Sequence, residues 1–103
     1  MNKFIKHDID NALSLLKVAI NNALSDIESG EEDEIVLGGY IPFSLVRQCV
    51  EDRGYLYDNN KKPFVSIEWD YWYYATNPEN GKYICIQGNF WYGTLKIWVV
   101  YDF

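Results

Sequence analysis

The sequence is poor in the residues that most metal, redox and nucleic-acid sites require. It contains one histidine and two cysteines in 103 residues. Nine Lys and Arg stand against fifteen Asp and Glu, which gives a net charge of −6. A surface that binds nucleic acid needs clustered cations to displace counterions from phosphates, so we expect no direct nucleic-acid binding. One histidine and two distant cysteines do not match a zinc site, and no metal or cofactor is predicted.

Long apolar runs are missing as well. Ser, Asn and Asp interrupt the apolar residues that follow the N-terminus, whereas a membrane-spanning helix needs about 20 predominantly apolar residues. Neither a signal peptide nor a membrane contact is therefore predicted, and we expect a cytoplasmic protein. In that compartment Cys49 and Cys85 are expected to be buried free thiols rather than a disulfide.

Catalytic motifs are also absent from the sequence, which has no nucleophile elbow, P-loop, dinucleotide-binding glycine pattern, His-Glu-x-x-His segment or calcium loop. Glu68 and Asp70 lie two positions apart on a predicted strand and therefore share a face. Desolvation by Trp72 or Tyr74 would suit this pair to acid–base chemistry. Because nothing else completes a site, the simpler interpretation is the solvent-exposed face of a sheet. No catalytic residue is predicted, and we expect no enzyme.

The chain is nevertheless rich in apolar residues: 49% are hydrophobic and 17% aromatic, enough for the core of one domain over residues 1–103. Apolar residues at alternating steps of four and three predict a helix over about residues 8–28, with Asp8 as N-cap and Gly30 just past its end. A second helix is predicted over about residues 42–53, starting with Pro42 and stopping at Gly54. The buried stripe of the first helix is expected to hold Ile9, Leu13, Leu16, Ile20, Ala23 and Ile27, widened by Leu15, Val18 and Leu24, and that of the second Leu45, Val46, Cys49 and Val50.

Strands are predicted mainly after the second helix. Residues 35–37 predict a short strand or an apolar anchor, and residues 58–63 a polar turn. Alternation over residues 65–73 predicts one strand with a single buried face. Its buried residues would be Val65, Ile67, Trp69, Tyr71 and Tyr73.

The remaining residues predict two further strands. Residues 77–81 are typical of a hairpin turn, followed by strands at 82–87 and 94–101. Residues 88–93 join them, either as a loop or as strand that continues to a tighter turn. The core face of the last strand would hold Leu95, Ile97, Val99 and Tyr101. Together the elements predict an α+β fold, with two N-terminal helices packed on one face of a three- to four-stranded antiparallel sheet.

The aromatic residues outnumber what one sheet face can bury. Six are predicted on the opposite face or at its rim: Trp72, Tyr74, Phe90, Trp91, Tyr92 and Trp98. Exposed rings would anchor a protein partner, since Trp and Tyr dominate binding hot spots, or they would stack on sugars or bases. The alternative without a function is that loops 31–41 and 55–63 cover them.

Five carboxylates occur within seven positions, which predicts a solvated acidic loop: Glu28, Glu31, Glu32, Asp33 and Glu34. Together with Glu68 and Asp70 they would face a basic surface, while the six exposed aromatics supply anchors. We therefore predict a non-catalytic module that binds a protein through these residues. The partner would have a basic surface, such as that of a nucleic-acid-processing enzyme, and the module would inhibit it by presenting charge like a phosphate backbone.

In size, charge and lack of a catalytic motif, the chain resembles the small acidic inhibitors of phages and mobile elements, immunity proteins and antitoxins. That resemblance implies occlusion of a partner's basic site. Two alternatives stay open. A carbohydrate- or small-ligand-binding domain would use Trp72, Tyr74 and Trp98 as a stacking platform. A homodimeric structural subunit would pair through the exposed sheet face or through the edge of the last strand.

Overall fold

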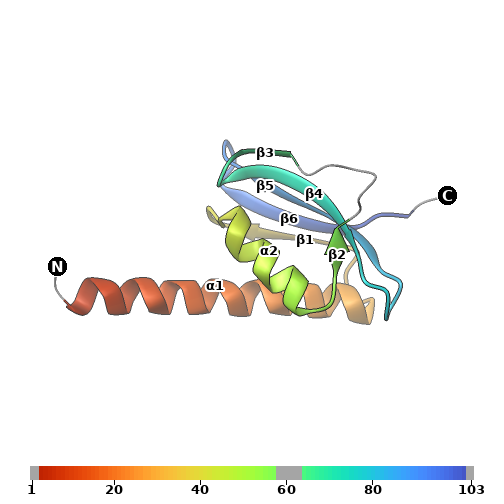
Figure 1. Ribbon diagram of the computed structural model, residues 1–103, viewed down its shortest axis with the longest axis horizontal. Coiled ribbons are helices and arrows are strands. Elements are labelled where there is room, and N and C mark those ends of the chain that lie inside the picture. The colour runs from red at the N-terminus through yellow and green to blue at the C-terminus, as the bar shows by residue number, and fades with distance from the viewer. Residues whose placement is uncertain (1–2, 58–63, 102–103) are drawn as a thin grey trace.

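The computed structural model describes residues 3–57 and 64–101 and has the predicted α+β class (Figure 1). Its two helices are α1 (Lys3–Ser29) and α2 (Phe43–Asp52). The strands in chain order are β1 (Glu34–Gly38), β2 (Leu56–Tyr57), β3 (Phe64–Ile67), β4 (Asp70–Thr76), β5 (Tyr83–Asn89) and β6 (Thr94–Val99). The sheet therefore has more strands than the three or four expected. The polar turn predicted at 58–63 lies outside the described residues.

Every pair of neighbouring strands is antiparallel, in the order β1-β6-β5-β4-β2, and β3 also pairs with β4. β2 and β3 meet successive parts of β4, with Leu56 opposite Thr76 and Phe64 opposite Trp72. β1 pairs with β6 and extends the sheet at its other edge. Residues 31–41 therefore add a strand to the sheet instead of covering one of its faces.

The core lies between the two helices and one face of the sheet. Alternate residues of β4, β5 and β6 point into it, and α2 contributes the four apolar residues predicted as its buried face. Each fully buried Ile, Leu or Val contributes about 1.5–3 kcal/mol by leaving water. The buried cluster consists of Ile20, Ala23, Leu24, Ile27, Ile41, Leu45, Val46, Cys49, Val50, Tyr55, Tyr71, Tyr73, Ala75, Ile84, Ile86, Leu95 and Ile97.

The sequence prediction of one strand over residues 65–73 was wrong. A turn at Glu68 and Trp69 divides it into β3 and β4, which pair as a hairpin. The Phe43 N–H at the start of α2 donates to the Glu68 carbonyl at 2.8 Å, so this turn also meets the helix end that needs acceptors. β3 lies at the margin of the sheet, and Val65, Ile67 and Trp69 are exposed there instead of buried.

α1 is longer than predicted and packs along only part of its length. It begins at Lys3, so Asp8 lies within the helix and is not its N-cap. Figure 1 shows the N-terminal half of α1 running past the sheet and α2. Leu13 is therefore exposed rather than buried. Leu15 and Val18 expose 70% and 55% of their surface because they lie on the side of α1 away from Leu16 and Ile20, which pack on the core. Gly30 ends the helix as predicted, with φ at +84°. In the described part of the chain, no helix has the length and apolar character needed to cross a membrane.

Other strand boundaries follow the prediction more closely. The hairpin turn at 77–81 is confirmed, with Gly81 at a φ of +73°. The 88–93 segment takes the second predicted form, because β5 continues to Asn89 before a tight turn. β6 ends at Val99, so Tyr101 lies beyond the strand and is exposed rather than in the core.

Candidate functional site

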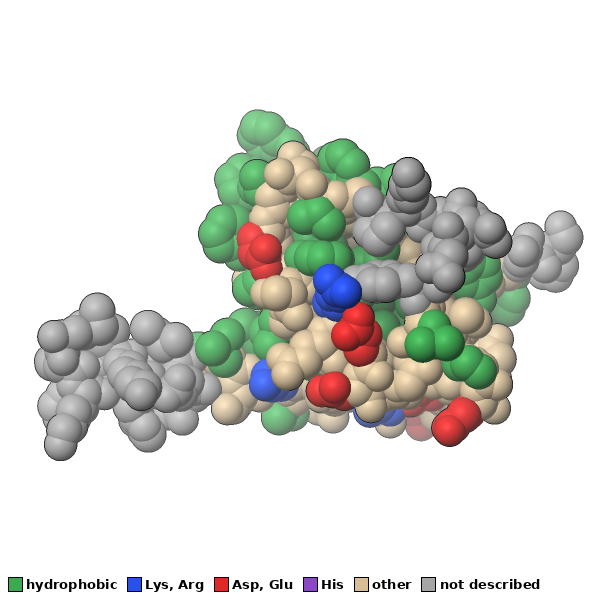
Figure 2. Space-filling model, in the orientation of Figure 1, with side chains coloured by type: hydrophobic (Ala, Val, Ile, Leu, Met, Phe, Trp, Pro, Cys, Tyr) green, Lys and Arg blue, Asp and Glu red, His purple; other side chains and the backbone are tan. Residues whose placement is uncertain are grey.

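Three turns meet at one end of the sheet and expose five aromatic residues, which we call the aromatic end: Tyr40, Trp69, Phe90, Trp91 and Tyr92. The first turn joins β1 to α2, the second joins β3 to β4, and the third joins β5 to β6. Figure 2 shows hydrophobic side chains gathered where the last two turns lie, with an acidic side chain beside them. Trp91 and Tyr92 expose 85% and 81% of their surface, which is unusual for large apolar residues in a small domain.

Backbone hydrogen bonds join the first and third turns. The Gly39 N–H donates to the Gly93 carbonyl at 2.7 Å, and the Gly93 N–H donates to the Asn89 carbonyl at 2.9 Å. Gly93 has a φ of +60°, and a Cβ there would lie 3.2 Å from the ring of Tyr40. The Asn89 Oδ1 accepts from the N–H groups of Trp91 and Tyr92 at 3.0 and 3.2 Å. Asn89 therefore shapes the turn that carries the two most exposed rings.

Two further contacts fix the first and second turns against the core. The buried Tyr71 hydroxyl donates to the Ile41 carbonyl at 2.7 Å, directly after Tyr40. The Ser44 N–H donates to the Glu68 Oε1 at 3.0 Å, and hydrogen bonds from Ser44 hold the pKa of Glu68 below its usual range. The aromatic end is therefore a set of exposed rings on a hydrogen-bonded backbone frame.

The rings of the aromatic end enclose an open hollow of about 260 Å³ lined by Tyr40, Trp69 and Phe90. The rings of Tyr40 and Phe90 lie 5.8 Å apart between centroids and are inclined at 48°. Trp91 meets Phe90 edge to face at 5.9 Å. The lining is almost wholly apolar, so the hollow can take a flat or apolar group but offers little hydrogen bonding from side chains.

The outer face of the sheet carries a second set of aromatics that contact one another. Phe64 stacks on Trp72 at 6.2 Å, Trp72 meets Tyr74 edge to face at 5.8 Å, and Tyr74 lies 5.8 Å from Tyr83. Cys85 lies opposite Tyr74 in the strand register and has only 2% of its surface exposed. These rings thus cover much of their own face, although Trp72 remains partly exposed.

Trp98 on the same outer face already has cationic and acidic neighbours within the chain. The Lys96 Nζ lies 5.0 Å from the centre of the Trp98 ring and 3.2 Å from the Glu34 Oε1. Glu34 is directly opposite Trp98 in the β1–β6 register. Two predicted partner-binding residues, Glu34 and Trp98, are therefore engaged with Lys96.

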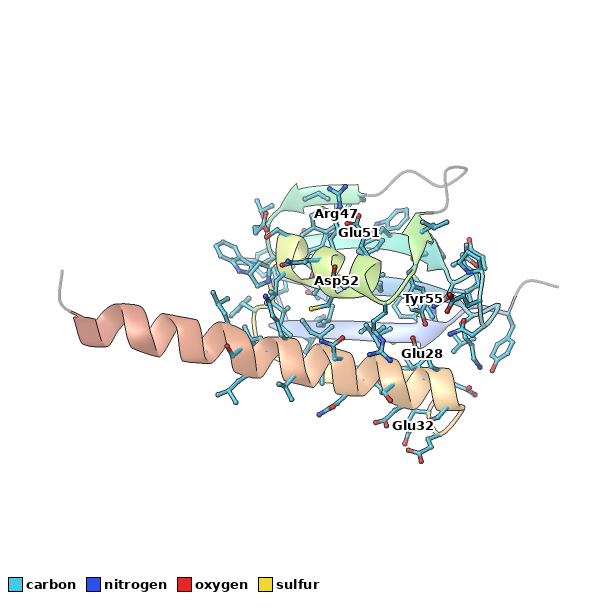
Figure 3. The ribbon with its side chains drawn as sticks, turned by 60° about the horizontal axis from the view of Figure 1, so that its bottom comes forward. Glu28, Glu32, Arg47, Glu51, Asp52 and Tyr55 are labelled. Carbon is cyan, nitrogen blue, oxygen red and sulfur yellow. The ribbon has the colours of Figure 1, made fainter. Side chains whose placement is uncertain are left out.

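Glu28, a predicted partner-binding residue, is engaged inside the fold. Its carboxylate forms an ion pair with the Arg53 guanidinium and accepts a hydrogen bond from the Tyr55 hydroxyl at 3.0 Å. Burial, followed by the charge of Glu28, raises the pKa of Tyr55 to about 12. Figure 3 shows Glu28 and Tyr55 side by side between α1 and the sheet, whereas Glu32 points away from them. The view that these five carboxylates form one solvated loop was therefore wrong at Glu28.

The rest of the acidic run forms what we call the acidic turn: Glu31, Glu32, Asp33 and Glu34. All four are exposed, and the Asp33 Oδ1 accepts a hydrogen bond from the Tyr101 hydroxyl at 3.0 Å. The acidic turn enters β1 and the aromatic end follows it, so about 13 Å of strand separates them. The acidic turn and the aromatic end therefore lie at opposite ends of the sheet. The other predicted residues do not follow this division, because Glu68 and Asp70 adjoin Trp69 and Trp98 lies opposite Glu34.

No group of three or more potential metal ligands occurs among residues 3–57 and 64–101. Glu68 and Asp70 do not share a strand face as predicted, because Glu68 lies in the turn and binds the start of α2. The two cysteines are buried and are not joined in a disulfide, with Cys49 in the core and Cys85 on the outer face. Burial raises the pKa of the Cys49 thiol, which disfavours the nucleophilic thiolate.

Sequence reasoning missed two residues of the aromatic end. Tyr40 follows two glycines, a pattern that indicates a turn and that would have placed its ring at the surface. Trp69 was assigned to the buried face because the alternation of residues 65–73 continues unbroken through it. No local signal in that stretch indicates the turn at Glu68, since the contact that stabilises it comes from α2.

Comparisons of the chain with protein-family models, curated proteins and solved structures gave no match. What the chain binds must therefore be argued from its own geometry.

Proposed function

We propose that this chain is a non-catalytic protein-binding module that contacts its partner through the aromatic end. The observation that carries this proposal is the presence of five exposed aromatic side chains on a hydrogen-bonded frame. Exposing such rings to water is unfavourable, and Trp and Tyr are the residues that most often dominate the energy of protein interfaces. A fixed frame reduces the entropy lost on binding, because the turns need not be ordered by the partner.

The charge of the chain supports a basic partner. Net charge is −6, and the acidic turn presents four exposed carboxylates at the other end of the sheet. Charges that lie outside a contact surface still accelerate association with an oppositely charged protein, in a manner that salt weakens. We assign affinity to the aromatic end and steering to the acidic turn. Inhibition, by occlusion of a nucleic-acid-binding surface of that partner, is the form of activity that this division of roles favours.

The test is affinity capture from the host lysate with matched variants. The double variant Trp91→Ala/Tyr92→Ala removes the two most exposed rings, and Tyr101→Ala removes an exposed ring outside the aromatic end. A protein retained by the wild type and by Tyr101→Ala, but lost from the double variant, supports the proposal. A protein retained equally by all three, or no protein retained at low salt, contradicts it.

Self-association is a second candidate function, favoured by the exposed apolar residues Leu13, Leu15 and Val18 on α1. A helical segment of about 13 residues is marginally stable in water by itself, so the projecting half of α1 would gain from a partner. Residues 1–17 contain three Lys and two Asp, a net side-chain charge of +1, whereas residues 18–103 contain six Lys and Arg and thirteen Asp and Glu, a net charge of −7. A second copy would therefore bring opposite charge to this helix.

Sedimentation equilibrium over a range of concentrations tests the second candidate. The variant Leu15→Glu/Val18→Glu places charge on the exposed side of α1 and should convert a dimer to a monomer. Ser25→Glu is the matched control, since Ser25 is an exposed residue of α1 within the half that packs on the sheet. A wild-type chain that stays monomeric at high concentration would exclude this function.

A further inference from the structure

We infer that the hollow of the aromatic end receives an arginine side chain of the protein partner. The inference rests on the proposed function and adds the chemistry of the group that the hollow binds. The hollow is lined by the rings of Tyr40, Trp69 and Phe90, whereas the more exposed Trp91 and Tyr92 lie outside its lining.

The shape of the hollow suits a planar cation on an apolar stem. Each of its three walls comes from a different turn, and two of the rings stand at 48° to each other with centroids 5.8 Å apart. Aromatic faces attract cations that lie within about 6 Å of the ring centre. A guanidinium is flat and weakly hydrated compared with an ammonium, so it stacks on such faces at a lower cost of desolvation. The volume of about 260 Å³ leaves room for the guanidinium and its methylene groups.

Elsewhere in the fold, the chain places one of its own cations on an aromatic ring. On the outer face, the Lys96 Nζ lies 5.0 Å from the Trp98 ring centre. The described residues that line the hollow are all aromatic, so its lining offers aromatic faces and no cation. Arg53, by contrast, is held in an ion pair with Glu28 of α1.

Charge beside the hollow favours a cation over an uncharged apolar group. Glu68 precedes Trp69 in the β3–β4 turn, and Asp70 follows it as the first residue of β4. The Ser44 N–H donates to the Glu68 carboxylate at 3.0 Å. This contact keeps Glu68 ionised to lower pH than usual. With a net charge of −6 on the whole chain, the field around the hollow attracts cations and repels carboxylates.

The test compares two peptides that differ only in charge. Acetyl-Gly-Arg-Gly-amide and acetyl-Gly-citrulline-Gly-amide are titrated separately into ¹⁵N-labelled protein, with backbone and Trp indole resonances observed by NMR. Citrulline keeps the planar shape and length of arginine without its charge. The arginine peptide should bind about 2-fold to 30-fold more tightly than the citrulline peptide. Its binding should change the chemical shifts of Tyr40, Trp69 and Phe90.

Two variants test whether binding depends on the aromatic face of Phe90 or only on the apolar volume of its side chain. Phe90→Leu keeps an apolar side chain in the hollow but removes one aromatic face, and should weaken binding of the arginine peptide while leaving the citrulline peptide unchanged. Tyr101→Ala, at the opposite end of the sheet, should change neither. The dispersion of the NMR spectrum reports whether each variant is folded.

Three results would overturn the inference. They are equal affinity for the two peptides, chemical-shift changes confined to residues 31–34, and no chemical-shift change with the arginine peptide at low salt. The proposed function fails separately, by retention of the same proteins on the Trp91→Ala/Tyr92→Ala variant. If capture depends on Trp91 and Tyr92 while the arginine peptide does not bind, the module still binds protein, and only the chemistry assigned to the hollow is wrong.

Discussion

The two ends of the sheet use polar and apolar residues in opposite ways. At the aromatic end, hydrogen bonds of Gly39, Glu68 and Asn89 hold the backbone, and the large apolar rings are left in water. At the other end, Glu28 is partly buried and paired with Arg53, and Glu34 is paired with Lys96. Apolar side chains are thus the exposed groups at one end, and several carboxylates are structural at the other.

This contrast shows why counts of charged and aromatic residues do not by themselves locate a binding surface. A carboxylate that accepts hydrogen bonds within the fold has little left to offer a partner, as at Glu28. An aromatic ring in a turn stays exposed when hydrogen bonds fix the backbone that carries it, as at Trp91, whose N–H donates to the Asn89 Oδ1.

The largest effect is expected from Gly88→Ala. An added Cβ at Gly88 would lie 2.4 Å from the ring of Tyr71. This ring is buried, and its hydroxyl donates a hydrogen bond to the Ile41 carbonyl. The ring cannot move without losing that hydrogen bond, so the free energy of unfolding should fall by about 3 kcal/mol. Chemical unfolding followed by Trp fluorescence measures it. Gly38→Ala, where a Cβ meets nothing within 4 Å, should change stability by less than about 0.5 kcal/mol. Equal losses in the two variants would contradict the close packing of Tyr71 on Gly88.

The second effect is a loss of stability at high pH that depends on Tyr55. Its pKa is raised to about 12 in the folded chain, from 10.0. The folded state therefore favours the neutral phenol, and this contribution is complete below pH 10 and lost as pH rises toward about 12. The free energy of unfolding should fall by about 2 kcal/mol over that interval. In Tyr55→Phe the fall should be smaller, and equal falls in both proteins would show that other groups cause it.

The third effect concerns the ion pair of Glu28. Glu28→Gln removes the charge that faces Arg53 in a partly buried position, so stability should fall by about 1–2 kcal/mol. Glu31→Gln is the matched control in the acidic turn, where an exposed carboxylate should contribute less than about 0.5 kcal/mol. If the two variants have similar free energies of unfolding in urea, Glu28 contributes no more than an exposed carboxylate, as the sequence suggested.

The sequence was sufficient to predict elements whose periodicity reflects burial on one face. α2 and its four buried residues follow from helical spacing, and β5 and β6 follow from the turn at 77–81 and from the alternation of residues 94–99. It was insufficient where a tertiary contact decides the structure. The turn at Glu68 is held by the start of α2, and Leu13 is exposed because the N-terminal half of α1 runs past the sheet.

The candidate site was predicted in part for the same reason. Phe90, Trp91 and Tyr92 lie in a short segment between two clear strands, so local sequence places them in a turn. Tyr40 and Trp69 join them only because β1 and the β3–β4 hairpin end at the same side of the sheet. That convergence depends on strand order, which local patterns do not contain.

The smallest effect on stability, and the most direct test of the comparison between the two ends, is expected from Trp91→Ala. The Trp91 side chain is 85% exposed, and its backbone N–H, which binds the Asn89 Oδ1, is unaffected by the substitution. The free energy of unfolding should therefore change by less than about 0.5 kcal/mol. Binding of a captured partner should weaken by at least about tenfold, as is usual for a Trp at the centre of an interface.

Neutralising Glu31 and Glu32 should instead slow association at low salt and leave the dissociation rate unchanged, because the proposal places these carboxylates outside the contact. Surface plasmon resonance separates the two rates. A dissociation rate raised by the acidic variant but not by Trp91→Ala would place the contact surface at the acidic turn.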